Sequence, residues 1–238
     1  MNLSQSEKDR CETFLVLFNQ IEEHLRIVLH QDDNTSFNTM MNRYIDQHKS
    51  WGRDRHTLNK IAKLRNILVH DRVSSYKFVA IPTEETISQA KFFRDRLINP
   101  QKVIPTFQRN VETLTSEEKL STVLRKINDC DYSQFPVSNS NQFFGLLTEN
   151  GITRWLAHHT SCQYSTVDFE EQLVSQILAE EEKRSNYTFV SRETLVDEIV
   201  EQFSSNLFLE AALITHNGRE NEKLLGIATR WDILHQLQ

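Results

Sequence analysis

Two segments in the second half of the sequence share the same pattern of residues. The segments FFGLLTENGITRWL and LLGIATRWDILHQL align with Gly145 over Gly226 and with Thr148 over Thr229. A spacing of about 80 residues is too long for the unit of a solenoid and suits two small α/β units in tandem. The repeat therefore predicts two related units, at about residues 101–160 and 180–238, within one domain that spans residues 100–238.

Residues 1–99 follow a different pattern. They contain a single glycine, Gly52, and this composition excludes a turn-rich all-β domain. Apolar side chains recur at helical spacing from Cys11 to Leu29, and further helices are expected at about residues 37–47, 56–70 and 83–97. The sequence Asn99-Pro100 ends the last helix. The fold class is therefore α+β and multidomain, with an all-α helical bundle over residues 1–99 followed by two α/β repeats.

Charge and composition narrow the classes of function. The chain has 27 basic and 33 acidic residues, so tight non-specific binding of nucleic acid is not expected. It contains neither G-x-G-x-x-G nor G-x-x-x-x-G-K-[ST], which excludes those two phosphate-binding loops. No apolar run approaches the roughly 20 residues that cross a bilayer. Three scattered cysteines, and a start without an apolar leader, favour a cytoplasmic protein that is not bound to a membrane.

Metal binding is not predicted. His158, His159 and Cys162 lie close together in the sequence, but no fourth ligand follows at the spacing of a metal site. We therefore interpret these side chains as solvent-exposed residues or as residues at a helix end.

The end of the second unit carries a candidate binding site. Thr229 follows an expected strand at the point where a helix begins, so its hydroxyl can cap that helix or contact a ligand. The backbone N–H groups of a first helical turn favour a phosphate. Asp232 lies three residues further on the same helix face, and its carboxylate can accept two hydrogen bonds from a ribose. In the alternative interpretation Thr229 is only an N-cap and Asp232 only complements the helix dipole.

The sequence Gly226-Ile-Ala-Thr229-Arg-Trp-Asp232 resembles the ligand motif of the CBS domain, a family that occurs in tandem pairs. The resemblance covers about residues 101–238. It implies an adenosine-containing small molecule as regulatory ligand, an adenine nucleotide whose identity the motif does not give. The residues that would bind the nucleotide are Thr229, Asp232 and Arg230, with the adenine held by the unit's first strand at Thr188 and Val190.

The first unit departs from this motif. Thr148 is present, but Gly151 stands where the second unit has Asp232. The first copy therefore lacks the carboxylate that would bind a ribose, and we expect one competent site per chain.

Three polar residues lie near the end of the third expected helix. Arg65 projects from the middle of its apolar face, where an unpaired charge is costly, and Asn66 and His70 are i,i+4 neighbours at the edge. Over residues 1–99 the chain resembles the HEPN superfamily of helical domains, which carry an R-N-x-x-x-H motif. The resemblance implies metal-independent cleavage of RNA in a cleft between two copies. Arg65 would hold the scissile phosphate, His70 would exchange protons, and Asn66 would orient one or both.

Two functions remain open at this point. In the first, the CBS pair senses an adenine nucleotide and controls a HEPN-like endoribonuclease. In the second, a non-catalytic nucleotide sensor recruits a partner protein through its helical domain, Arg65 pairs with Glu22 or Glu23, and His70 caps a helix end. We expect a homodimer formed through both the HEPN and the CBS domains.

Overall fold

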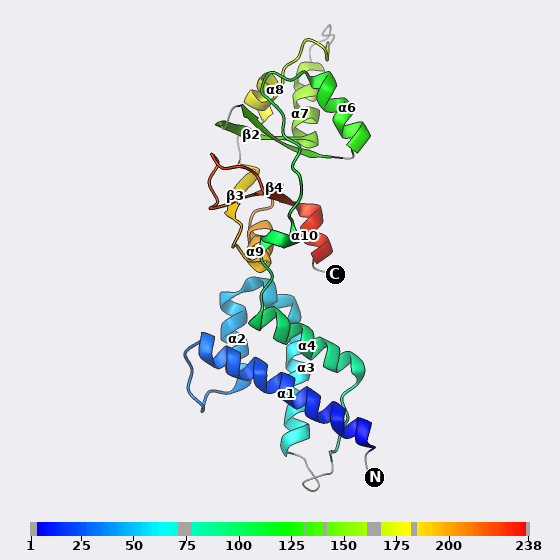
Figure 1. Ribbon diagram of the computed structural model, residues 1–238, viewed down its shortest axis with the longest axis vertical. Helices are drawn as coiled ribbons and strands as arrows, with labels where there is room; N and C mark the ends of the chain where they lie inside the picture. The colour runs from blue at the N-terminus through cyan, green and yellow to red at the C-terminus, as the bar shows by residue number, and fades with distance from the viewer. Residues whose placement is uncertain are drawn as a thin grey trace. The chain divides into compact units, whose positions relative to one another are not determined.

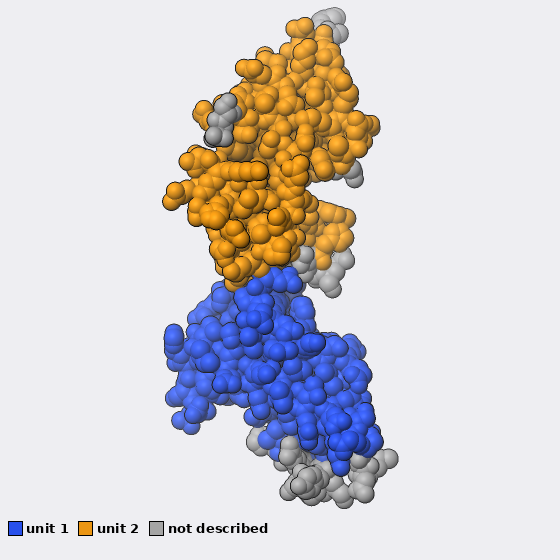
Figure 2. Space-filling model, in the orientation of Figure 1, with its two compact units in different colours: residues 1–101 blue, residues 102–238 orange. Residues whose placement is uncertain are grey.

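The chain divides into two compact units, Met1–Gln101 and Lys102–Gln238, called here the helical unit and the repeat unit (Figures 1 and 2). The computed structural model describes residues 4–70, 78–130, 132–139, 142–160, 168–181 and 185–236. Among the helices in these ranges, none is both long and apolar enough to span a bilayer.

The described part of the helical unit is mostly helical. Its elements are α1 (Gln5–Val28), α2 (Phe37–Gln47), the 3-10 helix η1 (Lys49–Asp54), α3 (Arg55–His70) and α4 (Glu84–Ile98). The helix α1 begins well before the apolar stripe because Ser4 and Glu7 cap it reciprocally. The Ser4 hydroxyl accepts the Glu7 N–H at 3.3 Å, and the Glu7 carboxylate accepts the Ser4 N–H at 2.7 Å.

The core of the helical unit is aromatic and aliphatic, and every helix contributes to it. In Figure 1, α1 and α4 lie side by side, in agreement with the contacts between these two helices. The largest side chains buried between the helices are Trp51, Phe14, Phe18, Ile21, Met40, Met41, Ile61 and Leu68. Burial of this apolar face is what stabilises helices of this length in water.

The repeat unit combines small sheets with helices. The first repeat holds α6 (Leu120–Cys130), β1 (Gln134–Asn139), β2 (Gln142–Thr148) and α7 (Glu149–Thr160); the second holds β3 (Tyr187–Ser191), α9 (Val196–Ser205), β4 (Ala211–Thr215), β5 (Gly226–Thr229) and α10 (Arg230–Gln236). The predicted fold class, a helical region followed by an α/β region, is confirmed.

Both repeats have the same mixed topology. In the second, β3 pairs parallel with β4, and β4 pairs antiparallel with β5. In the first, β1 pairs antiparallel with β2, and Leu114 pairs parallel with Val137 on the other side of β1. The repeated sequence pattern therefore corresponds to a repeated chain path.

The segment that precedes the first repeat packs into the core of the second repeat, and the segment that precedes the second repeat packs into the core of the first. We call these the first lead-in segment (residues 102–109, with α5, Val103–Thr106) and the second (residues 173–181, with α8, Val174–Glu181). Val103 and Phe107 are buried in the core of the second repeat, whereas Val174 and Ile177 are buried in the core of the first. This exchange ties the two repeats into one unit.

The two sheets also share a small core of their own. Leu146 of the first repeat is buried with Leu213 and Ile227 of the second. At its edge the ring centroid of Phe143 lies 4.9 Å from that of Tyr187, in an edge-on contact. These contacts set the position of β5 and of the helix that follows it.

Candidate functional site

Thr229 and Asp232 meet at the junction between β5 and α10. The Thr229 N–H donates to Asp232 Oδ2 at 2.7 Å, and the Thr229 hydroxyl donates to the same oxygen at 2.8 Å. The Asp232 N–H lies 3.4 Å from Thr229 Oγ1 and donates to it. This is a reciprocal helix cap. The capping interpretation of the sequence therefore describes the contacts seen here, and the same contacts hold the carboxylate in one orientation.

Arg109 is a third member of this cluster, and sequence reasoning missed it. Its Nη2 donates to Asp232 Oδ2 at 2.5 Å and to the Ile227 carbonyl at 2.5 Å, and its Nη1 donates to Asp232 Oδ1 at 3.3 Å. The Asp232 side chain is 22% exposed and that of Arg109 is 42% exposed. The two residues are 123 positions apart, and no helix or strand period relates positions at that distance.

The absence of a side chain at Gly226 allows Arg109 to approach Asp232. Gln108 pairs with Gly226 as the first lead-in segment crosses the start of β5. A Cβ atom on residue 226 would lie 2.2 Å from the Phe107 carbonyl oxygen. The glycine of the repeated motif therefore lets the backbone of the lead-in segment pass, and this passage places Arg109 over Asp232.

The electrostatics of the cluster keep Asp232 ionised. Burial by itself raises the pKa of the Asp232 carboxyl. Hydrogen bonds from the Arg109 guanidinium, and from the N–H and hydroxyl of Thr229, outweigh burial and lower the pKa below its ordinary value. At neutral pH the site therefore presents a fixed carboxylate, which can only accept hydrogen bonds.

The predicted adenine-binding residues lie on β3, at the opposite edge of the same sheet from β5. Thr188 and Val190 share one face of β3, and Val190 is buried in the core beneath α9. In the register Thr188 faces Ala212 on β4, which in turn faces Ala228 on β5. Two strand spacings separate Thr188 from the strand end at Thr229, about 10 Å. Thr188, Val190 and Thr229 thus belong to one sheet, and Asp232 lies in the first turn of the helix that follows that sheet.

Arg230, the remaining predicted ligand residue, makes contacts of another kind. Its guanidinium lies 5.5 Å from the centre of the Phe203 ring, and its Nη1 donates to the Phe203 carbonyl at 3.4 Å. Its Nη2 donates to the carbonyls of Asn206, Leu207 and Leu209. Arg230 therefore joins α10 to the end of α9 and the loop that follows.

The first repeat has the cap without the carboxylate. Thr148 is 2% exposed, and its Oγ1 accepts the N–H of Gly151 at 3.0 Å. Gly151 is buried in the first turn of α7. The junction keeps its hydrogen-bonded helix start but has no acid in the place of Asp232.

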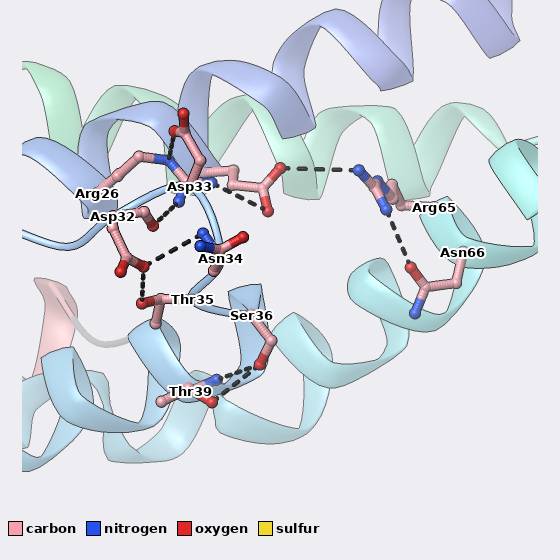
Figure 3. A network of polar contacts seen from close by, with 10 residues as sticks. Arg26, Asp32, Asp33, Asn34, Thr35, Ser36, Thr39, Arg65 and Asn66 are labelled. Carbon is pink, nitrogen blue, oxygen red and sulfur yellow. Dashed lines mark hydrogen bonds and ion pairs between the residues drawn. The ribbon is translucent and has the colours of Figure 1, made fainter.

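In the helical unit, Arg65 and Asn66 lie together on α3 (Figure 3). Arg65 Nη1 donates to Asn66 Oδ1 at 3.3 Å, and Arg65 Nη2 lies 3.8 Å from the Glu22 carboxylate. The guanidinium is also 5.4 Å from the centre of the Phe18 ring. The pairing with Glu22 is one of the alternatives left open by the sequence. The side chain of His70 lies outside the described residues.

Arg65 belongs to a longer network of charges. Glu22 lies 3.8 Å from Arg26, whose guanidinium also contacts Asp33 and the Asp32 carbonyl in the loop after α1 (Figure 3). The Arg65 Nε is buried, and no described residue accepts a hydrogen bond from it. One N–H donor of Arg65 is therefore left without an acceptor among the described residues, on a side chain that is 25% exposed.

Among the described residues, no group of three or more His, Cys, Asp or Glu side chains is placed to hold a metal ion. Cys162, which the sequence sets near His158 and His159, lies outside the described residues.

Residues 175–238 match the model of the CBS domain family. The C-terminal region therefore contains a CBS domain, which confirms the resemblance for α8 and the second repeat. A search of the curated proteins finds no match. The helical unit receives no family from these comparisons, so its likeness to HEPN domains stays a prediction.

Several solved structures resemble this one. A protein of Methanocaldococcus jannaschii, described as a candidate archaeal homologue of g-AMPK, is 16% identical with a TM-score of 0.47, and the match covers 74% of this chain and 63% of that one. A CBS domain protein of unknown function from Thermoplasma acidophilum is 17% identical with a TM-score of 0.45, covering 58% and 70%. A hexameric CBS-CP12 protein from bloom-forming cyanobacteria is 18% identical with a TM-score of 0.44, covering 58% and 73%.

Proposed function

We propose that this chain is a regulatory protein that binds an adenosine-containing nucleotide in its second α/β repeat. The observation that carries the proposal is the ionised Asp232 carboxylate, which Thr229 holds at the end of a strand within the residues that match the CBS family. An acceptor fixed in this way suits the adjacent hydroxyls of a ribose, which both donate hydrogen bonds.

The remainder of the ligand would lie along the sheet. β3 is an edge strand of the second repeat, and edge strands present backbone N–H and C=O groups that can pair with the polar rim of a base. With the ribose at Asp232, the adenine would lie toward Thr188 and Val190, about 10 Å away across the sheet. Gly151 leaves the first repeat without a ribose acceptor, so we propose one nucleotide per chain.

Binding can be tested with a thermal-shift screen of AMP, ATP, cyclic di-AMP, NAD and S-adenosylmethionine, followed by calorimetry on each hit. We expect at least one compound to stabilise the wild type and to lose its effect in Asp232→Asn. The matched control is Asp129→Asn, which removes an exposed carboxylate of the first repeat. Failure of every compound in the wild type, or equal binding by Asp232→Asn, would reject the proposal.

A second candidate function concerns the helical unit. The observation that favours it is the pairing of Arg65 with Asn66 on a solvent-accessible part of α3. We propose that Arg65, Asn66 and His70 cleave RNA without a metal in a homodimer formed through both units, under control of the nucleotide. The ion pair between Arg65 and Glu22 favours the competing function, a non-catalytic unit that recruits a partner protein.

The two functions of the helical unit are separated by an RNA cleavage assay in EDTA, with and without the nucleotide. A ribonuclease should cleave at least one member of a broad RNA panel, and His70→Ala and Arg65→Ala should abolish cleavage. His158→Ala, at an exposed position of α7, is the control and should cleave normally. An intact panel under both conditions would leave the sensor that recruits a partner.

A further inference from the structure

The carboxylate that we propose as the ribose acceptor already accepts several hydrogen bonds from its own chain. In the described part of the chain, Asp232 Oδ2 accepts hydrogen bonds from the Thr229 N–H, the Thr229 hydroxyl and Arg109, and Oδ1 accepts one from Arg109. A carboxylate offers about four acceptor positions. Two ribose hydroxyls therefore cannot bind Asp232 until the Arg109 guanidinium moves away.

The two parts of Arg109 differ in freedom. Its backbone is held because Gln108 pairs with Gly226 and the Phe107 N–H donates to the Val103 carbonyl. The side chain, in contrast, is 42% exposed and bound through its terminal nitrogens. After leaving Asp232, the guanidinium would remain within one side-chain length of that carboxylate. It would therefore lie close to any group that is attached to the bound ribose.

A displaced guanidinium needs a new anion. Its fork of N–H donors binds a phosphate in two-point geometry as well as it binds a carboxylate. A phosphorylated adenosine brings such an anion to the site, whereas adenosine itself does not. Building on the proposed nucleotide site, we propose that Arg109 selects phosphorylated adenosines over the nucleoside by exchanging Asp232 for the ligand's phosphate.

This selection has two opposite parts. Against a nucleoside, Arg109 is a competitor for Asp232, so its removal strengthens binding. For a nucleotide, removing Arg109 ends the competition for Asp232 but also removes the contact between the guanidinium and the phosphate. Removal of Arg109 therefore weakens nucleotide binding or leaves it unchanged. The quantity to measure is therefore the ratio of the two dissociation constants, adenosine to AMP, which Arg109 raises.

The test is calorimetric titration of AMP and adenosine, a pair that differs only in the phosphate, into the wild type, Arg109→Gln, Arg109→Lys and Arg125→Gln. Arg125 is an exposed arginine of the first repeat and serves as the matched control. We expect the ratio to fall about tenfold or more in Arg109→Gln, the size of one charge-assisted contact, to fall less in Arg109→Lys, and to stay unchanged in Arg125→Gln.

The outcomes distinguish this inference from the proposed function. If AMP binds the wild type through Asp232 but both dissociation constants change by the same factor in Arg109→Gln, Arg109 is a structural contact and only the selection is overturned. If neither compound binds the wild type, the selection and the AMP site fall together. Should Arg109→Gln fail to fold, Arg109→Lys decides, because lysine keeps the positive charge but loses the two-point geometry, and an unchanged ratio in that variant would overturn the selection.

Discussion

The two repeats of the C-terminal region share a topology and differ in the residue that lies three positions after the threonine of the strand–helix junction. Thr148 and Thr229 both cap the helix that follows. Three residues later the first repeat has Gly151 and the second has Asp232. The first repeat shows that the fold needs the cap but not the carboxylate. A carboxylate at this position is therefore not required for such a junction to form, although in the second repeat Arg109 and Thr229 both donate hydrogen bonds to it.

A second difference lies where the lead-in segments cross the repeats. At Gly145 a Cβ would lie 3.1 Å from the side chain of Leu178, and at Gly226 it would lie 2.2 Å from the Phe107 carbonyl. A side chain can rotate away, whereas a backbone carbonyl held by its neighbours cannot. The crossing is therefore tighter in the second repeat, and this tighter crossing brings Arg109 to Asp232.

The largest expected effect on stability comes from a substitution that obstructs the crossing of the first lead-in segment over β5. Gly226→Ala should lower the free energy of unfolding by about 3 kcal/mol, because the new methyl group overlaps backbone. Gly145→Ala should cost less, about 1–2 kcal/mol, because the Leu178 side chain can move and only the strain of a side chain at the positive φ of residue 145 remains. Urea denaturation followed by circular dichroism measures both, and an equal loss in the two variants would contradict the difference.

The next effect concerns the carboxylate that the first repeat lacks. Asp232→Asn should lower the free energy of unfolding by about 2 kcal/mol at pH 7, since Arg109 and Thr229 lose a charged acceptor. The pKa of Asp232 is lowered on folding from 3.8, so this contribution is complete above about pH 4 and is lost as the pH falls through the folded-state pKa.

Urea midpoints of the wild type and Asp232→Asn, measured from pH 7 down to pH 2, check this sign. The gap between the two should close in acid. A gap that is constant over the whole range would show that the ionised state of Asp232 does not stabilise the fold.

A smaller effect compares the two caps. Thr148→Ala should cost about 1.5 kcal/mol, because the buried N–H of Gly151 loses its acceptor. Thr229→Ala should cost about 1 kcal/mol, since the Thr229 N–H still donates to Asp232. Thermal unfolding of the two variants ranks them, and a larger loss for Thr229→Ala would reverse this account.

The smallest effect is local to the turn between β4 and β5. Hydrogen bonds from the N–H and side chain of Asn217 lower the pKa of the exposed Glu222 carboxyl to about 2. Carboxyl carbon shifts should therefore show Glu222 ionised over most of the acid range, and Asn217→Ala should raise its midpoint toward 4.5. Asn128→Ala, an exposed change in the first repeat, should leave that midpoint in place.

Local patterns in the sequence located the elements well. The apolar spacing predicted a helix at residues 37–47, and α2 spans Phe37–Gln47. The repeated ending predicted a strand followed by a helix at Thr229, and β5 ends and α10 begins there. The positions of helices and strands depend on residues within about one helical turn or one strand. Apolar periodicity and capping residues therefore predict them.

Contacts between distant segments were not predictable in the same way. The sequence allowed Arg65 to pair with Glu22 or Glu23, and the packing of α1 against α3 selects Glu22. It gave no sign that Arg109 reaches Asp232. That contact depends on the exchange of the lead-in segments between the repeats. No pattern in the sequence of either segment indicates into which repeat it packs.

The sequence by itself thus determined the two-part organisation, the repeat and the Thr229–Asp232 pair, since each is expressed in residues close together along the chain. The tertiary structure alone decided what surrounds Asp232. Gly226 lets the first lead-in segment cross β5, and that crossing brings the Arg109 guanidinium to a carboxylate that is 123 positions away in the sequence. The physical reason is that side chains far apart in sequence meet only when the chain has packed.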